Sequence, residues 1–317
     1  MSPISATDAR LHNIPVNRID RNPENPRIYF RQGELDQLLE SIRLYGVQVP
    51  ISVYKDGKRY VLIDGERRWR CCLKLNKATI PALVQARPSA LDNLLLMFNI
   101  HSLREQWDLL TIALKLPRVI QLHEKQHGKP PNERELSEQT GLARATVRRS
   151  KLLMELPQQY KDLLLKELHA PKSKQRLTED FFIEMERALT TVARAMPEVI
   201  PDRDAARQAL LDKYRDNVIS DMVDFRDLAR IARAENVEAD PDKAKSVLRR
   251  VLAPNSYSIA AAYADSVSGA YEERDILTRV QWLAEHLDSV ARRDLDPDLR
   301  KALLVLMARL RHLLRER

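Results

Sequence analysis

The chain has 317 residues and a mass of 36.7 kDa, which is enough for two or three compact domains with buried cores. Hydrophobic residues make up 44% and charged residues 31%, a balance typical of a folded protein rather than a disordered one. The net charge of +8 favours a polyanionic partner such as nucleic acid. With only 7 glycines, the sequence excludes a Gly-rich nucleotide loop of the Walker or Rossmann type.

Cysteine usage and hydropathy indicate the compartment. Cys71 and Cys72 are adjacent, which is poor geometry for a disulfide, and two cysteines are too few for a zinc cluster. We therefore expect a reducing compartment, with at least one of the two thiols buried. No apolar run approaches membrane-spanning length, and the first ten residues lack the order of a secretory signal. These features predict a cytoplasmic protein.

The first 87 residues mix short strands with helices. Residues 14–19 and 80–84 are expected to form strands, and residues 51–54 and 60–63 a hairpin around Asp56-Gly57. Residues 34–45 have apolar side chains at helical spacing, with Gly46 as the expected helix end.

After Pro88 only helical periodicity is found, interrupted by prolines. The predicted fold class is α+β. We expect a small mixed α/β domain over residues 1–88, a helical DNA-binding domain over residues 89–172 and a helical region over residues 173–317.

A helix-turn-helix is predicted around Gly141. Asn132 and Glu135 have the spacing of a capping box that opens a short helix, and Ser137 is small enough to let a second helix approach. Gly141 supplies the turn, and the second helix begins at about residue 142, with Val147 facing inward.

The second helix is basic, with no acid before Glu155. The side chains that we expect at its surface are Arg144, Thr146, Arg148, Arg149 and Lys151. Such residues suit contacts to phosphates and to guanine edges in a major groove, so the pattern predicts binding to double-stranded DNA. The alternative is a solvated helix of an ordinary bundle.

The segment Gly65-Glu66-Arg67-Arg68-Trp69-Arg70 follows a predicted strand and opens a helix. Backbone N–H groups at a helix start, together with two arginines, can cradle a phosphate. Taken alone, such a segment is more often a solvated helix end.

The order of these motifs resembles the ParB family of chromosome and plasmid partition proteins over residues 12–165. The matching segments are Asn22-Pro23-Glu24-Asn25-Pro26-Arg27, Leu38-Leu39-Glu40-Ser41-Ile42, Gly46-Val47-Gln48-Val49-Pro50, Gly65-Glu66-Arg67-Arg68-Trp69-Arg70, Ile80-Pro81 and Leu152-Leu153-Met154-Glu155-Leu156-Pro157. The resemblance implies a ParB/sulfiredoxin-like N-terminal domain that binds CTP with Mg²⁺.

It also implies a nucleotide-switched clamp that loads at a palindromic DNA site, associates with the nucleoid or a plasmid, and stimulates a ParA-type ATPase. Carried onto this sequence, the nucleotide contacts would come from Arg27, Gly65, Glu66, Arg67, Arg68 and Asn99.

The chain departs from the family pattern where the family helps to hold Mg²⁺. The acid of that box is Phe98 here and its arginine is Ser102, while Asn25 stands where many members carry a glutamine linked to hydrolysis. An apolar ring cannot replace a carboxylate as a Mg²⁺ ligand. We therefore expect CTP hydrolysis to be weak or absent, and a glutamate at position 98 to strengthen Mg²⁺-dependent nucleotide binding.

His123-Glu124-Lys125-Gln126-His127 fits the H-E-x-x-H pattern of zinc metalloproteases. Lys125 is charged and Gly128 ends the helix at once, so we interpret the motif as a solvated helix end and predict no metal site.

The last helix repeats apolar residues at alternating spacings of four and three, as in a coiled-coil seam. These residues are Leu299, Leu303, Leu306, Leu310 and Leu313. The seam predicts a homodimer through the C-terminal helix, as ParB proteins form. The alternative is a terminal helix that packs on its own domain.

Two rival functions remain at this point. A transcription regulator of the same architecture would bind an operator without a ParA partner. A nucleotide-dependent kinase of small molecules would share the N-terminal domain but would not need a basic helix in a helix-turn-helix. A nuclease is disfavoured because the sequence shows no clustered carboxylates with metal-ligand spacing.

Overall fold

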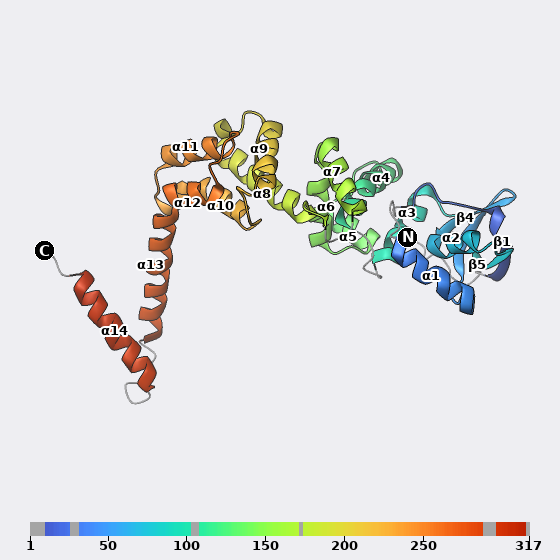
Figure 1. Cartoon of the computed structure of the whole chain (residues 1–317), viewed down its shortest axis with the longest axis horizontal. Coiled ribbons are helices and arrows are strands. Elements are labelled where there is room, and N and C mark those ends of the chain that lie inside the picture. The colour runs from blue at the N-terminus through green and yellow to red at the C-terminus, as the bar shows by residue number, and fades with distance from the viewer. Residues whose placement is uncertain (1–9, 26–31, 103–107, 171–173, 288–295, 315–317) are drawn as a thin grey trace. The chain divides into compact units, whose positions relative to one another are not determined.

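The computed structural model describes residues 10–25, 32–102, 108–170, 174–287 and 296–314 (Figure 1). The chain forms two compact units, Met1–Ile183 and Glu184–Arg317. In the described part of the chain, none of the helices has the length and apolarity needed to cross a bilayer.

The first unit contains a mixed sheet of five strands in the order β1-β5-β3-β4-β2. The strands are β1 (Arg10–Pro15), β2 (Ile19–Asp20), β3 (Ile51–Asp56), β4 (Arg59–Asp64) and β5 (Thr79–Gln85). Strand β3 is central, antiparallel to β4 and parallel to β5. The N-terminal domain therefore has the mixed α/β character that the sequence predicts.

The predicted hairpin is confirmed: β3 and β4 are joined at Gly57, whose φ of +59° suits a glycine turn. The single strand expected over residues 14–19 is wrong. β1 ends at Pro15, a 3₁₀ turn spans Val16–Arg18, and β2 follows. Because β1 and β2 lie at opposite edges of the sheet, the chain must leave one edge and cross to the other.

Two helices complete the α/β part. Helix α1 (Gln32–Tyr45) ends at Gly46, which has φ +73° and donates its N–H to the Ile42 carbonyl at 3.0 Å, as expected for a helix stop. Helix α2 is Glu66–Lys74, and both of its cysteines, Cys71 and Cys72, are buried. Burial raises the pKa of both thiols, which disfavours their thiolate forms.

The rest of the first unit is helical. Its helices are α3 (Ala90–Ser102), α4 (Leu109–His127), α5 (Glu133–Thr140), α6 (Arg144–Met154), α7 (Gln158–His169) and the start of α8 (Glu179–Ala195). Helices α3 to α6 share an apolar core that includes Phe98, Leu116 and Val147. Glu179 of α8 accepts the backbone N–H of Leu110 at 2.6 Å and thereby caps the start of α4.

The described residues of the second unit form helices and the segments that connect them. After α8 come α9 (Arg203–Arg215), α10 (Asp224–Ile231), α11 (Pro241–Val251), α12 (Ile259–Ser266), α13 (Ser268–Leu287) and α14 (Pro297–Leu313). A buried ion pair, with Arg207 Nε 2.6 Å from Glu186 Oε1, joins α9 to α8. The prediction that only helices follow Pro88 is confirmed for the described residues, while the domain boundaries at 88 and 172 stay predictions.

Candidate functional site

The junction between β4 and α2 is the first candidate site, and its geometry depends on Gly65. Gly65 has φ +96°, a left-handed conformation that costs glycine nothing. A Cβ at this position would lie 2.6 Å from Cγ2 of Ile51, so any other residue would force the Ile51 side chain to move. The tight turn starts α2 directly after the strand, and the electropositive end of that helix favours an anion.

Glu66, the first residue of α2, is a buried carboxylate surrounded by protein donors. Its Oε1 accepts Nε and Nη2 of Arg70 at 2.9 and 2.6 Å and lies 3.2 Å from Nε of Arg21. Its Oε2 accepts Nδ2 of Asn25. A buried charge is tolerated only when it is paired and hydrogen-bonded in this way. Both oxygens hold residues 21–25 against α2, so the structure gives Glu66 a positioning role.

Arg68 is also engaged within the protein. Its Nη1 donates to the carbonyls of Val49 and Pro50 at 2.5 and 2.6 Å, and its Nη2 donates to Asp64 at 2.8 Å. The side chain is 14% exposed. Arg68 therefore fixes the start of β3 to α2. Arg67, the preceding residue of the same helical turn, is half-buried. A phosphate role for either arginine stays a prediction.

Asn22 is one of the residues of this site to which the sequence analysis gave no role, together with Arg21 and Asn93. It is 1% exposed, and its Nδ2 donates to the Leu62 carbonyl at 2.7 Å and to Oδ1 of Asn93 at 3.1 Å. Its Oδ1 accepts the N–H of Glu24 at 3.0 Å. Asn22 thus joins a loop, β4 and α3. The signal was its position before Pro23, where an Asn side chain often organises a turn.

The residues of α3 at which the sequence analysis placed the family's Mg²⁺ box make packing and helix–helix contacts in the structure. Phe98 is fully buried in the core of α3 to α6, and Asn99 donates from Nδ2 to the carbonyls of Leu95 and Gln139 at 2.9 and 2.8 Å. Asn99 therefore links α3 to α5. Ser102 is the last residue of α3, and Arg27 lies outside the described residues. The structure brings Glu66, Arg67 and Arg68 together on one turn of α2, whereas Asn99 lies on α3.

Helices α5 and α6 form the second candidate site. The predicted capping box is present: Oδ1 of Asn132 accepts the N–H of Glu135 at 2.9 Å, and the Glu135 carboxylate accepts the N–H of Asn132 at 2.8 Å. Gly141 ends α5 with φ +71°, and the hydroxyl of Ser137 donates to the Leu142 carbonyl at 2.7 Å. Helix α6 begins at Arg144 rather than at about residue 142, because the turn occupies the intervening residues.

The inner face of α6 is apolar and its outer face is basic. Val147 and Leu153 are buried, whereas Arg144 and Arg148 are exposed. Thr146, Arg149 and Lys151 are half-buried. Arg148 pairs with Glu133 of α5 at 2.9 Å, and Arg149 pairs with Asp180 of α8. These partly exposed pairs are weak, so the arginines can exchange them for phosphate or base contacts.

The histidines of the H-E-x-x-H motif pack against each other. The rings of His123 and His127 stack with centroids 4.2 Å apart, and their Nδ1 atoms face the carbonyls of Lys129 and His123. The interpretation as a solvated helix end is wrong for His123, which is 3% exposed, and holds for His127. Within the described residues, no group of three or more His, Cys, Asp or Glu side chains could hold a metal ion.

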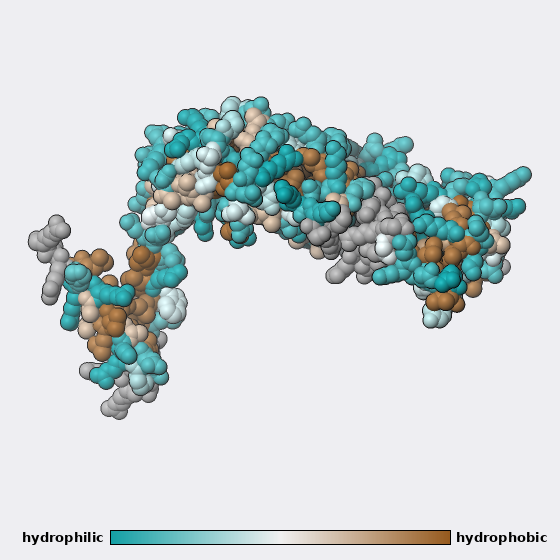
Figure 2. All heavy atoms as spheres, viewed as in Figure 1, coloured by the Kyte–Doolittle hydropathy of each residue, from teal (hydrophilic) through white to brown (hydrophobic). Residues whose placement is uncertain are grey.

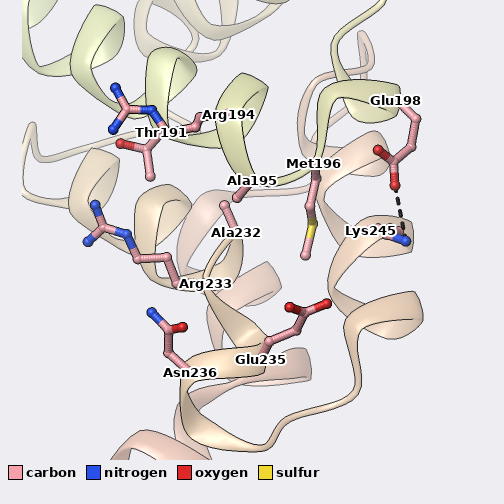
Figure 3. A pocket seen from close by; sticks show the side chains of 10 residues that line it. All are labelled: Thr191, Arg194, Ala195, Met196, Glu198, Ala232, Arg233, Glu235, Asn236 and Lys245. Carbon is pink, nitrogen blue, oxygen red and sulfur yellow. Dashed lines mark ion pairs between the residues drawn. The ribbon is translucent and has the colours of Figure 1, made fainter.

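A pocket of about 340 Å³ lies in the second unit, between the end of α8, the start of α11 and the segment after α10 (Figure 3). Glu198 pairs with Lys245 at 3.0 Å on one side, and Arg194 and Arg233 line the pocket as well. A hydrogen bond from its own backbone N–H and the Lys245 ammonium lower the pKa of Glu198. The lining mixes charges of both signs, and we assign it no chemistry.

Residues 3–97 match the model of the ParB N-terminal domain family. A nucleoid occlusion protein of Geobacillus kaustophilus is 30% identical over 157 residues, which are 49% of this chain and 53% of that protein. The chromosome-partitioning protein ParB of Myxococcus xanthus is 41% identical over 80 residues, which are 25% of this chain and 27% of that protein. The chain thus spans about half, or less, of the length of these relatives.

Two solved structures of C-terminally truncated ParB from Caulobacter crescentus are also similar. The complex with the centromeric parS site has a TM-score of 0.44 and 19% identity, and covers 70% of this chain and 98% of that one. The complex with CTP-gamma-S has a TM-score of 0.29 and 23% identity, and covers 56% of this chain and 92% of that one.

The burial of Phe98 gives a prediction opposite to the one from the motif alone. We expect Phe98→Glu to lower the free energy of unfolding by about 3–5 kcal/mol, because it places an unpaired carboxylate in an apolar core. Phe98→Leu is the control and should cost less than about 1.5 kcal/mol. Urea unfolding measures both variants. A glutamate variant as stable as the parent, with stronger Mg²⁺-dependent nucleotide binding, would contradict this account of Phe98.

Proposed function

We propose, from the premise that residues 3–97 are a ParB N-terminal domain, that this chain is a site-specific DNA-binding protein acting in plasmid or chromosome segregation. The observation that carries the proposal is the α5–α6 pair. Its turn is closed by Gly141, its inner face is apolar, and the outer face of α6 presents arginines held only by weak ion pairs.

The shape of α6 suits a recognition helix. Arg144 and Thr146 stand in its first turn, the part of such helices that meets base edges, and Arg148 follows one turn later. Arginine can bind guanine through two hydrogen bonds, and lysine adds phosphate contact. A solvated bundle helix needs neither the tight turn nor this one-sided basic surface. These features favour double-stranded DNA as the partner.

We further propose that the corner around α2 binds CTP, with Mg²⁺ and with phosphates at the helix start near Arg67. Support comes from the tight Gly65 turn, the favourable end of the helix and the network that holds residues 21–25 beside it. Hydrolysis should be weak or absent, since Phe98 is committed to the core. Nucleotide binding would then switch a DNA clamp without rapid turnover.

The proposed assembly is a homodimer through α14, because a palindromic site has two-fold symmetry and needs two copies of α6. Helix α14 exposes its apolar residues in the described structure. A ParA-type ATPase is the partner protein that the ParB relationship suggests, and association with nucleoid or plasmid DNA follows from DNA binding. Relatives named for partition and for nucleoid occlusion both fit this chemistry.

Replacing Arg148 and Arg149 by alanine should abolish specific DNA binding. Loss of two base-reading side chains costs about 2–6 kcal/mol, which is a loss of affinity of about 30-fold or more. The measurement is fluorescence anisotropy at physiological salt, with duplexes that the parent protein has enriched from a random-sequence pool.

The matched control is Arg43→Ala with Arg187→Ala, which removes the same charge from two exposed, ion-paired arginines on α1 and α8, outside the α5–α6 pair. The control should bind DNA within about threefold of the parent, since it alters only nonspecific attraction. Parent-like affinity in the Arg148→Ala, Arg149→Ala variant would refute the assignment of α6.

Arg67→Ala should lose CTP binding while keeping the fold, whereas Arg68→Ala should also lose stability because three protein acceptors lose their donor. Calorimetry with CTP, ATP, GTP and UTP in the presence of Mg²⁺ measures the binding, and Arg43→Ala on α1 is the control. Failure of the parent protein to bind any nucleotide would leave a nucleotide-independent DNA-binding dimer.

Charged residues on the α14 seam should separate the dimer. We expect Leu303→Glu with Leu306→Glu to reduce the mass measured by light scattering from twice 36.7 kDa to 36.7 kDa. Lys301→Glu, which lies off the seam, is the control. An unaltered mass in the Leu303→Glu, Leu306→Glu variant would show that the seam does not form the dimer.

A further inference from the structure

Helix α13 carries an apolar stripe of its own that no sequence motif pointed to. Ile276, Val280, Leu283 and Leu287 repeat at spacings of four, three and four, the period of a helix-packing seam. Ile276 is 60% and Val280 50% exposed, and no residue of α13 is buried in the described structure. Figure 2 shows hydrophobic side chains at the surface along both C-terminal helices.

The apolar face of α14 is broader than a two-stranded coiled coil requires. Ala302, Met307 and Leu314 flank the seam on its two sides, and Met307 and Leu314 are exposed. A helix that packs against a single partner helix in a coiled coil needs only a narrow apolar stripe. A helix with a broader apolar face packs against more than one neighbouring helix. The width of this face therefore indicates that α14 packs against at least two other helices.

The two helices are complementary in charge. Helix α13 carries four acidic and two basic side chains, whereas α14 carries one acidic and four basic ones, histidine not counted. An α14–α14 contact alone would bring like charges together, and packing of α13 beside α14 relieves that repulsion. Nine residues separate the two helices, one more than the usual range for bundle connections and enough to let the helices run antiparallel side by side.

The first turns of α13 are fixed to the body of the second unit. The Tyr271 hydroxyl donates to the Arg230 carbonyl at 3.3 Å, and Arg274 donates to the carbonyl of Asn236. The Arg230 guanidinium lies 5.8 and 5.7 Å from the rings of Tyr263 and Tyr271. The stripe begins only after this anchor, on the part of α13 that none of these contacts reaches.

We infer that α13 and α14 of one chain pack with α13 and α14 of a second copy as a four-helix bundle. The inference rests on the proposed dimer and deepens it: the occupant of the α13 stripe is a second copy of this chain. Packing of α13 on α14 within one chain would cover only part of each apolar face. The α13 and α14 helices of the second copy would cover the remaining part. The interface between the two copies then extends from α14 along α13 to its first turns, which are fixed to the second unit.

The test is the dimer dissociation constant of the full chain, measured by analytical ultracentrifugation. Ile276→Glu with Val280→Glu should raise this constant at least 100-fold. The control is Trp282→Gln, because Trp282 is 58% exposed and lies outside the apolar stripe of α13. It should leave the constant within threefold. Circular dichroism checks that helices persist, and Ile276→Ser with Val280→Ser provides a milder variant if the glutamates reduce helicity.

The outcomes distinguish this inference from the simpler dimer. An unchanged constant in the α13 variants, while Leu303→Glu with Leu306→Glu gives monomers, would mean that α14 dimerises alone and would overturn the inference. Dimers that survive both sets of substitutions, or a monomeric parent, would instead overturn the proposed C-terminal dimer and the bundle with it. Loss of the dimer in the α13 variants, with the Trp282→Gln control intact, supports the bundle.

Discussion

The buried carboxylate of Glu66 is the constraint around which the N-terminal domain is organised. Because its charge is out of water, it must keep its partners, and these come from Arg70 on α2 and from Arg21 and Asn25 before α1. The same turn requires glycine at position 65. A strand end, a helix start and a loop are thereby held at one corner, where the positive end of α2 can receive an anion.

The two candidate sites of the first unit are connected by buried polar contacts through α3. Asn22, in the loop beside Glu66, bonds to Asn93 on α3, and Asn99 on the same helix bonds to the backbone of α5. Phe98 lies between them in the core that also contains Val147 of α6. In the proposed function, these contacts would connect the corner around α2 to the DNA-binding helices through α3.

Sequence patterns predicted the elements whose signals are local. The Asp56-Gly57 turn, the Gly46 helix end and the capping box at Asn132 depend on neighbouring residues and were confirmed. Tertiary context decided the rest. The strand expected over residues 14–19 breaks because its two ends belong to opposite edges of the sheet. The sequence also did not show that Phe98 is buried in the core of α3 to α6. Nor did the sequence show that Arg68 donates to the carbonyls of Val49 and Pro50, and its predicted phosphate contact stays a prediction.

Hydrogen–deuterium exchange of the full chain, with and without an enriched palindromic duplex, tests the central claim most directly. The account predicts that the duplex slows exchange in α6, Arg144–Met154, and in the turn before it, because that helix enters the groove. The sheet core around Ile51 should be unaffected. Slowed exchange elsewhere in the chain, with α6 unchanged while the duplex is bound, would contradict the account.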